Sequence, residues 1–338
     1  MTKMKAFILA AGFGTRLWPL TEDRTKAAIP FLNRPLIAYS VEYLASHGIR
    51  DIIVNLHHQP DSIRRALGDG SKFGVNISYS FEEQILGTSG ALDPVRESLL
   101  DDDFLVINGK IITNIDLGRA IAAHRRQKAL ATLVLKENVL REHFSIVEVD
   151  DRSWITRFAG FPDAVSSQAV SAYAITGQAS VVTKNGAVPL MFTGIQVLSP
   201  RIFDYIPRGC FSHSTIDVYP RAIAEGEPVI ADISSADWYE MSTISRYLEA
   251  SLRLKRERDR SIVAGEGCVI EDGASVEDAV LWDNVTVKRG ARVSHSVLAE
   301  GVTIPVGSEI ERAVVVRREV ASQIERDKIA GENIIVPI

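Results

Sequence analysis

Short, continuous apolar runs alternate with amphipathic stretches along the first third of the chain. The runs are almost free of polar residues, as is typical of strands buried on both faces of a parallel sheet. They lie at residues 7–10, 52–54, 104–107 and 132–135. Apolar residues at helical spacing lie between them, over residues 37–44 and 117–124. The alternation predicts a doubly wound α/β domain whose ligands bind at the C-terminal ends of the strands.

The pattern is more mixed between residues 140 and 240, where strands of alternating character such as 146–149 occur. We interpret this stretch as the remainder of the same domain, which then covers residues 1–243. Helical spacing resumes after it and leads into the charged run 255–260, which is typical of a solvated helix end. Residues 244–260 are therefore predicted to form a linker helix.

The last part of the chain, residues 261–338, repeats itself. Short Val/Ile pairs separated by Gly, Asp, Glu and Asn recur with a period of 17 residues. Five columns align under this period: Cys268, Val285 and Val302; Ile270, Val287 and Ile304; Gly273, Gly290 and Gly307; Val276, Val293 and Ile310; and Val280, Val297 and Val314. Five columns in register are hard to reconcile with an irregular β-sandwich and predict three coils of a triangular solenoid. The segment resembles the hexapeptide-repeat left-handed β-helix, and its handedness is implied by that resemblance.

The composition adds limits to this picture. A chain of 338 residues suggests two domains, at roughly 150 residues each. The net charge of −5 leaves no excess of basic residues for holding nucleic acid, and no run of about 18 apolar residues predicts a membrane span. The only cysteines, Cys210 and Cys268, cannot form a disulfide framework. We expect two buried thiols and a cytoplasmic protein, because the cytosol is reducing.

A glycine-rich turn follows the first predicted strand directly. It reads Ala11-Gly12-Phe13-Gly14-Thr15-Arg16, and Lys26 follows it. Glycines let a backbone approach a phosphate closely, backbone amides can form an anion-binding concavity, and basic side chains neutralise the oxygens. The turn is neither the dinucleotide fingerprint, which needs a third glycine or an alanine, nor a P-loop, which ends in Gly-Lys-Ser/Thr. The predicted contacts to nucleotide phosphates are Leu9, Ala10, Ala11, Gly12, Gly14, Thr15 and Arg16.

The longer stretch 9–21, together with Lys26 and Pro30, resembles the signature of the sugar-1-phosphate nucleotidyltransferases, also called nucleotide-sugar pyrophosphorylases. Residues 86–92 resemble the family segment that lies against the base and ribose, and residues 192–198 resemble the segment that lines the sugar pocket. The overall pattern is most similar to the GDP-mannose pyrophosphorylase branch. The resemblance implies a Rossmann-like nucleotidyltransferase domain with a parallel-dominated mixed sheet, followed by the left-handed β-helix.

The resemblance also implies a reaction. In this family a sugar 1-phosphate attacks the α-phosphate of a nucleoside triphosphate and expels pyrophosphate, while carboxylate-bound Mg²⁺ neutralises the phosphates. Arg16 and Lys26 would be the catalytic basic residues. The implied nucleotide contacts further along the chain are Gly87, Thr88, Asn108 and Gly109, and the implied sugar-pocket residues are Ser145, Thr193 and Gly194.

Several positions depart from the family pattern. Lys110 follows Asn-Gly, where the family has its principal metal-binding Asp, and Glu240 stands where the second carboxylate is an Asp. Gly160 and Phe161 replace the Glu-Lys whose lysine helps hold the sugar phosphate, and Ser145 replaces a glycine. A protonated lysine cannot coordinate Mg²⁺ and repels it, so no metal ligand set is predicted beyond the retained acid Glu240.

Two functions stay open from the sequence. The first is a nucleoside triphosphate:sugar-1-phosphate nucleotidyltransferase with an atypical active site, in which Lys110 paired with Glu240 takes the place of the metal. The second is a catalytically silent binder of a nucleotide or nucleotide sugar that regulates or assembles with an active homologue. The changed metal and sugar-phosphate residues favour weak or absent activity. We also expect a homo-oligomer or an assembly with such a homologue, because solenoids generally cap or pair their open ends.

The histidines offer little further chemistry. His57, His58, His143 and His213 lack a carboxylate or cysteine at metal-site spacing and are expected to be solvated or hydrogen-bonded. His295 lies in the repeat region, and some β-helix enzymes are acyltransferases with a catalytic histidine. A third hypothesis is therefore an acyltransferase, but one isolated histidine on three coils is weak evidence for it.

Overall fold

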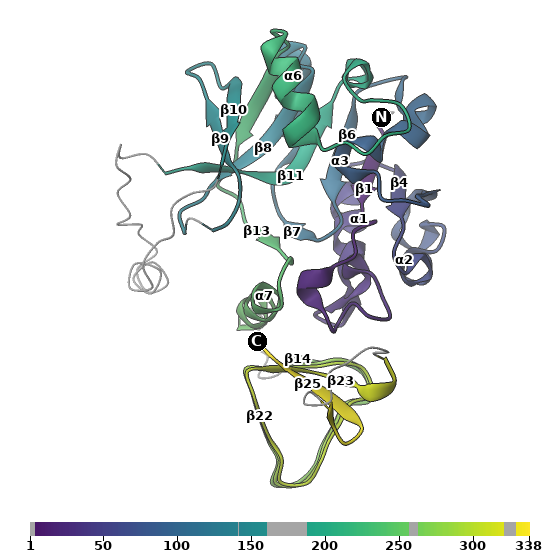
Figure 1. Ribbon diagram of the computed structural model, residues 1–338, viewed down its shortest axis with the longest axis vertical. Helices are drawn as coiled ribbons and strands as arrows, with labels where there is room; N and C mark the ends of the chain where they lie inside the picture. The colour runs from purple at the N-terminus through teal and green to yellow at the C-terminus, as the bar shows by residue number, and fades with distance from the viewer. Residues whose placement is uncertain (1–3, 141, 161–187, 257–262, 321–328) are drawn as a thin grey trace.

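The computed structural model describes residues 4–140, 142–160, 188–256, 263–320 and 329–338. Within these residues, nine strands form one mixed sheet at the centre of the N-terminal unit (Figure 1). They are β1 (Ala6–Leu9), β4 (Asp51–Leu56), β5 (Asn76–Phe81), β6 (Phe104–Asn108), β8 (Ala131–Glu137), β9 (Ile146–Val149), β10 (Ile155–Ala159), β11 (Leu190–Leu198) and β12 (Val229–Ile233). All four strands predicted from the continuous apolar runs are therefore present.

The sheet combines parallel and antiparallel pairs. Strands β5, β4, β1 and β6 pair in that order and run parallel, and β12 runs parallel to β8. Strand β11 lies antiparallel between β6 and β8, and it also pairs with the antiparallel ribbon of β9 and β10. The predicted parallel-dominated mixed sheet is confirmed. The direction of β11 is a property of the tertiary structure, because an apolar run buried on both faces has the same pattern in either direction.

Helices cover both faces of this sheet. Successive residues of β1 point to opposite layers, so that Ala6 and Ile8 pack with α1, α2 and α4 while Phe7 packs with α6. The helices are α1 (Leu36–Ser46), α2 (Pro60–Leu67), α3 (Gly87–Gly90), α4 (Leu117–Gln127) and α6 (Tyr219–Ala224). The doubly wound arrangement is confirmed. In the part of the chain that the structure describes, no helix is both long and apolar enough to cross a membrane.

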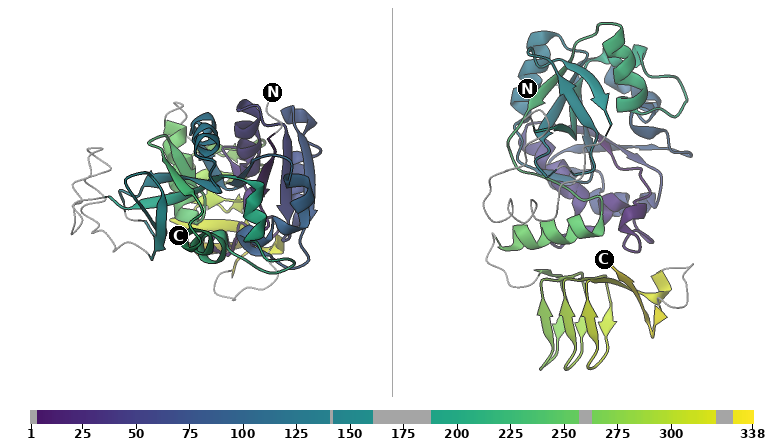
Figure 2. Two further views of the ribbon diagram at one scale, coloured as in Figure 1. Left: turned by 90° about the horizontal axis from the view of Figure 1, so that it is seen from above. Right: turned by 60° about the vertical axis from the view of Figure 1, so that its left-hand side comes forward.

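The repeat region is a solenoid of short parallel strands, and Figure 1 looks along it so that its coils superpose as a triangle. One stack contains β14 (Val263–Ala264), β17 (Val280–Leu281), β20 (Val297–Leu298) and β23 (Ala313–Arg317); the second contains β15 (Val269–Ile270), β18 (Thr286–Val287) and β21 (Thr303–Ile304); the third contains β16 (Ser275–Glu277), β19 (Arg292–Ser294) and β22 (Glu309–Glu311). Pairing joins residues 17 positions apart, such as Val280 with Val297, which confirms the predicted period. Figure 2 shows the coils as successive rungs. After the last coil, the antiparallel strands β25 (Asn333–Pro337) and β24 (Ile329–Ala330) extend the first stack.

Helix α7 (Ile244–Arg256) lies between the two units (Figure 2), and its residues Tyr247 and Leu248 are buried. The rest of the predicted linker, residues 257–260, lies outside the described residues. Tyr247 belongs to an apolar cluster that runs without a break into both units. The cluster includes Leu17 and Leu20, which follow the glycine-rich turn, and Trp282 of the β-helix. The repeat region therefore shares one apolar cluster with the segment next to the glycine-rich turn.

Both cysteines are free thiols, and the expectation of two buried thiols is wrong: Cys210 is exposed and Cys268 is only partly buried. The loop that carries it packs through its backbone. The Ser212 amide donates to the Leu86 carbonyl oxygen at 2.9 Å, and the Ser89 amide donates to the Ser212 carbonyl oxygen at 3.1 Å. Ser212 itself is buried, whereas the side chains of Cys210 and Phe211 just before it face solvent.

Candidate functional site

The glycine-rich turn leaves the C-terminal end of β1 and opens onto the molecular surface. At Gly12, a Cβ atom would meet no atom within 4 Å, so the space beside this residue is free. Gly14 has a φ of +73°, and a Cβ atom there would lie 2.9 Å from Cγ2 of Thr21. The Thr21 hydroxyl donates to the Gly14 carbonyl oxygen at 3.1 Å. Gly14 is therefore required by the turn itself, whereas Gly12 leaves room for a ligand.

A buried carboxylate connects the start of this turn with the 86–92 segment. The Ala10 amide donates to Oδ1 of Asn55 at 2.6 Å, and Nδ2 of Asn55 donates to Oε1 of Glu82 at 2.6 Å. The other oxygen of Glu82 accepts the Leu86 amide at 2.9 Å, and the residue is only 2% exposed. These bonds fix two backbone segments that the sequence predicted to contact one nucleotide. The sequence analysis missed Asn55 and Glu82, because neither belongs to a local motif.

The 86–92 segment is also held from its other side. Gly87 opens helix α3, and the hydroxyl of Thr88 accepts a hydrogen bond from the Ser214 amide at 2.9 Å. Ser89 and Ser212 bond through their hydroxyls at 2.8 Å. The segment that resembles the base-binding element is thus rigidly placed between β5 and the loop that carries Cys210.

A cavity of about 520 Å³ lies beside the turn, at the C-terminal end of β6. The ends of β1 and β6 coincide there, because Leu9 pairs with Asn108. Six residues of the predicted site line the cavity: Arg16, Asn108, Lys110, Thr193, Gly194 and Glu240. Phe192, from the segment that resembles the lining of the sugar pocket, also lines it. Seven further residues line it that were not predicted as site residues: Glu142, His143, Phe144, Trp238, Ser242, Thr243 and Arg246.

The remaining predicted residues lie around this cavity or away from it. Ser145 is exposed and does not line it, whereas the ring of its neighbour Phe144 does. Gly160 follows the end of β10, where its carbonyl oxygen accepts the Ile146 amide at 3.0 Å. Phe161 lies outside the described residues.

One side of the cavity contains the Asn108 amide, which packs against the backbone at Gly194, and the rings of Trp238 and Phe144. A Cβ atom on Gly194, whose φ is +82°, would lie 2.0 Å from Nδ2 of Asn108, so only glycine lets this amide stay in place. The Trp238 indole donates to the Thr193 carbonyl oxygen at 3.0 Å, and its ring meets the edge of the Phe144 ring. An oriented amide beside aromatic rings is an arrangement that can hold a sugar.

Lys110 and Glu240 meet because β7 (Ile111–Thr113) pairs antiparallel with β13 (Trp238–Glu240). The Lys110 ammonium donates to Oε1 of Glu240, and Arg246 on α7 donates to Oε2 at 3.2 Å. Glu240 has only 3% of its side chain exposed. Burial alone would raise the pKa of Glu240, but the charge and hydrogen bond of Lys110 hold it below its ordinary value. Both oxygens of this carboxylate are therefore bonded to cations.

Arg246 extends this ion cluster toward the strand β8. Its second amino group donates to Glu142, and its guanidinium lies over the Phe144 ring, 4.6 Å from the ring centre. The sequence missed both Arg246 and Glu142, because Arg246 stands in the predicted linker helix and Glu142 in a connection without a motif. Only the packing of α7 against the sheet brings them to the cavity.

The structure offers few groups for holding a metal ion. Within the described residues, no three His, Cys, Asp or Glu side chains converge as a metal-binding group. His57 and His58 instead hydrogen-bond to the backbone carbonyl oxygens of Glu82 and Thr21, at 2.8 and 3.1 Å.

Lys26 is the third basic residue of this region, with Arg16 and Lys110. Burial and the positive charge of Lys110 lower the pKa of Lys26 to about 8, with a further contribution from Arg16 and a partial offset by Glu240. At neutral pH Lys26 is therefore mainly charged, and the single carboxylate of Glu240 offsets only part of the positive charge of this region. The cavity and the turn thus share a region that attracts anions.

Comparison with known proteins agrees with this geometry. The profile of the nucleotidyl transferase family matches residues 5–257, and that of the GlmU-like C-terminal hexapeptide matches residues 248–334. A UTP–glucose-1-phosphate uridylyltransferase from Synechocystis sp. is 30% identical over 303 residues, which cover 84% of this chain and 72% of that protein. A mannose-1-phosphate guanylyltransferase from Mycobacterium tuberculosis is 27% identical over 314 residues, which cover 85% and 82%. The expected resemblance to the GDP-mannose branch is confirmed.

A solved structure shares the fold. The crystal structure of a putative glucose-1-phosphate thymidylyltransferase from Bacillus anthracis, in complex with a sucrose, matches with a TM-score of 0.60 and 23% sequence identity. The match covers 75% of this chain and 96% of that one. The names of these three proteins contain three different nucleotides and two different sugars, so similarity alone does not select a base or a sugar for this chain.

Proposed function

The chain belongs to the nucleotidyl transferase family, and we propose that it binds a nucleoside triphosphate or a nucleotide sugar at the C-terminal edge of its sheet. The free space at Gly12 supports contact between the phosphates and the backbone of the turn. Arg16 and Lys26 provide positive charge for the phosphate oxygens. Gly87 and Thr88 contact the base and ribose, as the family resemblance implies.

The sugar occupies the cavity beside the turn. The oriented side-chain amide of Asn108 and the backbone at Thr193 and Gly194 support this placement, and the Trp238 ring offers an apolar face. The nominal reaction is that of the family: a phosphate oxygen of the sugar 1-phosphate attacks the α-phosphate, a new P–O bond forms, and pyrophosphate leaves. The chain's own contribution is to hold the two phosphates in line, where misplacement of a reactant costs rate steeply.

The pairing of Lys110 with Glu240 carries our proposal about activity. The residues present do not fit a protein-held Mg²⁺ ion, since the position expected to supply a carboxylate supplies an ammonium, and both oxygens of Glu240 are bonded to cations. We infer that Lys110 stands in for part of the missing metal charge. A fixed ammonium can retain a bound phosphate, but it cannot gather oxygens as a coordinating metal does. Pyrophosphorylase activity is accordingly weak or absent.

The alternative is a silent subunit that regulates or assembles with an active homologue. The same ion cluster favours it, because Lys110, Glu240 and Arg246 satisfy one another in the absence of substrate. Such a site binds nucleotide without needing a metal. Both candidate functions include nucleotide binding, and they differ in whether the bound nucleotide is turned over.

A panel of nucleoside triphosphates, nucleotide sugars and sugar 1-phosphates tests the proposal. Calorimetry on the full chain is expected to find at least one nucleotide or nucleotide sugar that binds, and pyrophosphate release is expected to stay slow with and without Mg²⁺. A chain that binds no member of the panel would remove the proposed site. Rapid Mg²⁺-dependent release would show instead that the family reaction is intact.

The pH dependence of nucleotide binding follows from Lys26. With its pKa at about 8, this side chain is charged below that pH and loses its proton above it. A bound phosphate favours the charged form, so the affinity is expected to be nearly constant up to about pH 7, about twofold weaker at pH 8 and about tenfold weaker at pH 9. Lys26→Arg keeps its charge throughout and should flatten the profile. Calorimetric titrations at pH 7, 8 and 9 check this, and an unchanged native profile would exclude Lys26 from the phosphate site.

We also propose that the β-helix takes part in assembly, with a second copy or with a homologue. Its first coil presents strands β14, β15 and β16, each paired on one side only among the described residues. Val269 and Ile270 on that coil are 50% and 40% exposed, whereas Val287 in the next coil is buried. Open strand edges beside exposed apolar side chains favour association. Sedimentation velocity on the full chain at micromolar concentration is expected to show an oligomer, and a monomer would contradict self-assembly.

A further inference from the structure

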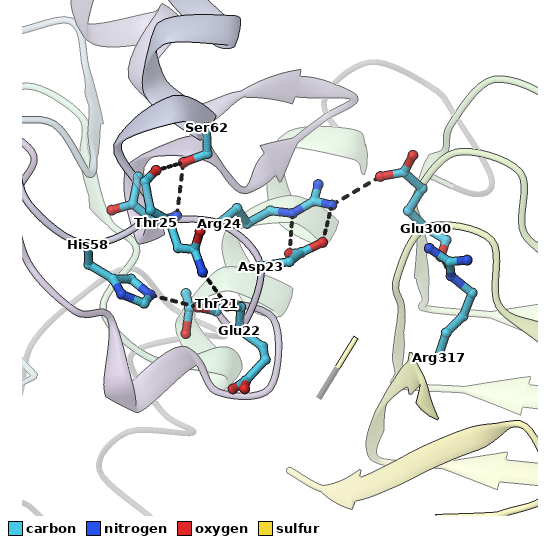
Figure 3. Close-up of polar contacts among 10 residues, drawn as sticks. Thr21, Glu22, Asp23, Arg24, Thr25, His58, Ser62, Glu300 and Arg317 are labelled. Carbon is cyan, nitrogen blue, oxygen red and sulfur yellow. Dashed lines mark hydrogen bonds and ion pairs between the residues drawn. The ribbon is translucent and has the colours of Figure 1, made fainter. Parts of the chain in front are cut away.

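The segment that joins the glycine-rich turn to Lys26 lies directly against the β-helix. Figure 3 shows the contact: Arg24 reaches from this segment to Glu300, 276 positions further along the chain. Its guanidinium donates to Glu300 at 3.0 Å and to both carboxylate oxygens of Asp23, at 2.8 and 3.0 Å. The guanidinium also lies over the Trp282 ring, 5.0 Å from its centre. The carboxylates of Asp23 and Glu300 and the ring of Trp282 thus fix the Arg24 guanidinium.

The partners of Arg24 are themselves held by the β-helix. The Arg317 guanidinium donates to the Glu300 carbonyl oxygen at 3.1 Å, which fixes that corner of the coil. The Trp282 indole donates to the Tyr247 hydroxyl at 2.9 Å, and this hydroxyl donates to the Pro30 carbonyl oxygen at 2.5 Å. The β-helix therefore contacts this part of the chain directly at Arg24, and it contacts Pro30 through Tyr247 of α7, so that Lys26 lies between the two places.

The residues beside Arg24 tie the same segment to the glycine-rich turn. The Thr25 hydroxyl donates to the Ala10 carbonyl oxygen at 3.2 Å, and the Thr25 amide donates to Oγ of Ser62 at 3.1 Å (Figure 3). Together with the bond from Thr21 to Gly14, these contacts join both ends of the segment to the turn. Any shift of Arg24 therefore moves the backbone that supports the turn and carries Lys26.

We propose that Glu300 and Trp282 of the β-helix are positioning residues for the nucleotide site, acting through Arg24 on the segment that carries Lys26. The inference rests on the proposed function and gives the β-helix a role in it beyond assembly. Because coupling between two sites is reciprocal, nucleotide binding also stabilises the contact between Arg24 and the β-helix. A subunit that binds this coil of the β-helix and shifts Glu300 or Trp282 would change the nucleotide affinity. Assembly could regulate nucleotide binding in this way.

Three variants of the full chain test the inference. Arg24→Met removes the charge and keeps the length of the side chain, while Glu300→Gln removes the partner on the β-helix. Glu271→Gln is the control, because Glu271 pairs with Lys288 at 2.9 Å within the β-helix and its side chain is 33% exposed, against 48% for Glu300. Arg24→Met is expected to weaken nucleotide binding by about tenfold and Glu300→Gln by about threefold, whereas the control stays within about 1.5-fold of the native affinity. Thermal unfolding checks that each variant folds.

Two further measurements separate positioning from a general loss of stability. Amide hydrogen exchange of residues 10–26 in the nucleotide-free protein is expected to become faster in the Arg24 and Glu300 variants and to stay unchanged in the control. The double variant is expected to bind no more weakly than Arg24→Met alone, because Glu300 acts through Arg24.

The possible failures are distinguishable. Unchanged affinity in Arg24→Met overturns the inference, even if exchange becomes faster, because the contact would then hold the segment without positioning the site. If the losses of binding free energy in the two single variants add up in the double variant, Glu300 does not act through Arg24. A native protein that binds no nucleotide overturns the proposed function itself, and the exchange rates still report whether the contact restrains the turn.

Discussion

Lys110→Asp is expected to make nucleotide binding dependent on Mg²⁺, with about tenfold tighter binding in its presence than in its absence. In the native protein the ammonium occupies one oxygen of Glu240 and repels a divalent cation. The substitution frees that oxygen and adds a second carboxylate beside it. A divalent ion then has oxygen ligands from two residues as well as from the phosphates. Calorimetric titrations with and without Mg²⁺ measure the change.

Lys110→Gln is the control for this experiment. It removes the positive charge without adding a carboxylate, so nucleotide affinity should fall and stay nearly independent of Mg²⁺. The native protein should also respond little to Mg²⁺, because its cation site is filled by a side chain. If Lys110→Asp binds no better with Mg²⁺ than without it, Lys110 does not occupy the metal position, and our proposal that it makes the activity weak or absent is wrong.

Gly12→Val is expected to weaken nucleotide binding by more than about a hundredfold and to leave the thermal stability nearly unchanged. A Cβ atom at this position meets nothing within 4 Å, so a side chain can leave the backbone there without a clash at Cβ. In the proposed site the phosphates need the same space, and the branched side chain would exclude them from the backbone of the turn. Calorimetry and thermal unfolding of the same preparation separate the two effects.

Gly14→Ala serves as the matched comparison, because this substitution is expected to lower the stability of the protein. Its φ of +73° and the 2.9 Å approach of Thr21 make even a methyl group unfavourable. The free energy of unfolding should drop by about 1–2 kcal/mol. Binding that survives unchanged in Gly12→Val would show that the phosphates lie elsewhere.

The features that the sequence determined are those set by neighbours along the chain. The apolar runs predicted β1, β4, β6 and β8, since burial on both faces needs continuous apolar residues whatever the partners are. The period of 17 residues predicted the solenoid, because each coil packs on copies of itself. The turn around Gly12 and Gly14 was also evident, since its backbone requirements are local.

The tertiary structure decided which distant residues meet. Asn55 with Glu82, Arg246 with Glu142 and Arg24 with Glu300 contribute no local pattern, because a polar residue that will be buried looks the same in the sequence as one that will be solvated. The neighbours of each become fixed only when β4 pairs with β5, α7 packs beside the sheet and the β-helix docks on the segment after the turn. These pairings depend on long-range packing. The glycine-rich turn and the pairing of Lys110 with Glu240 could be anticipated from the sequence, whereas the contacts of Arg246 and the support from the β-helix could not.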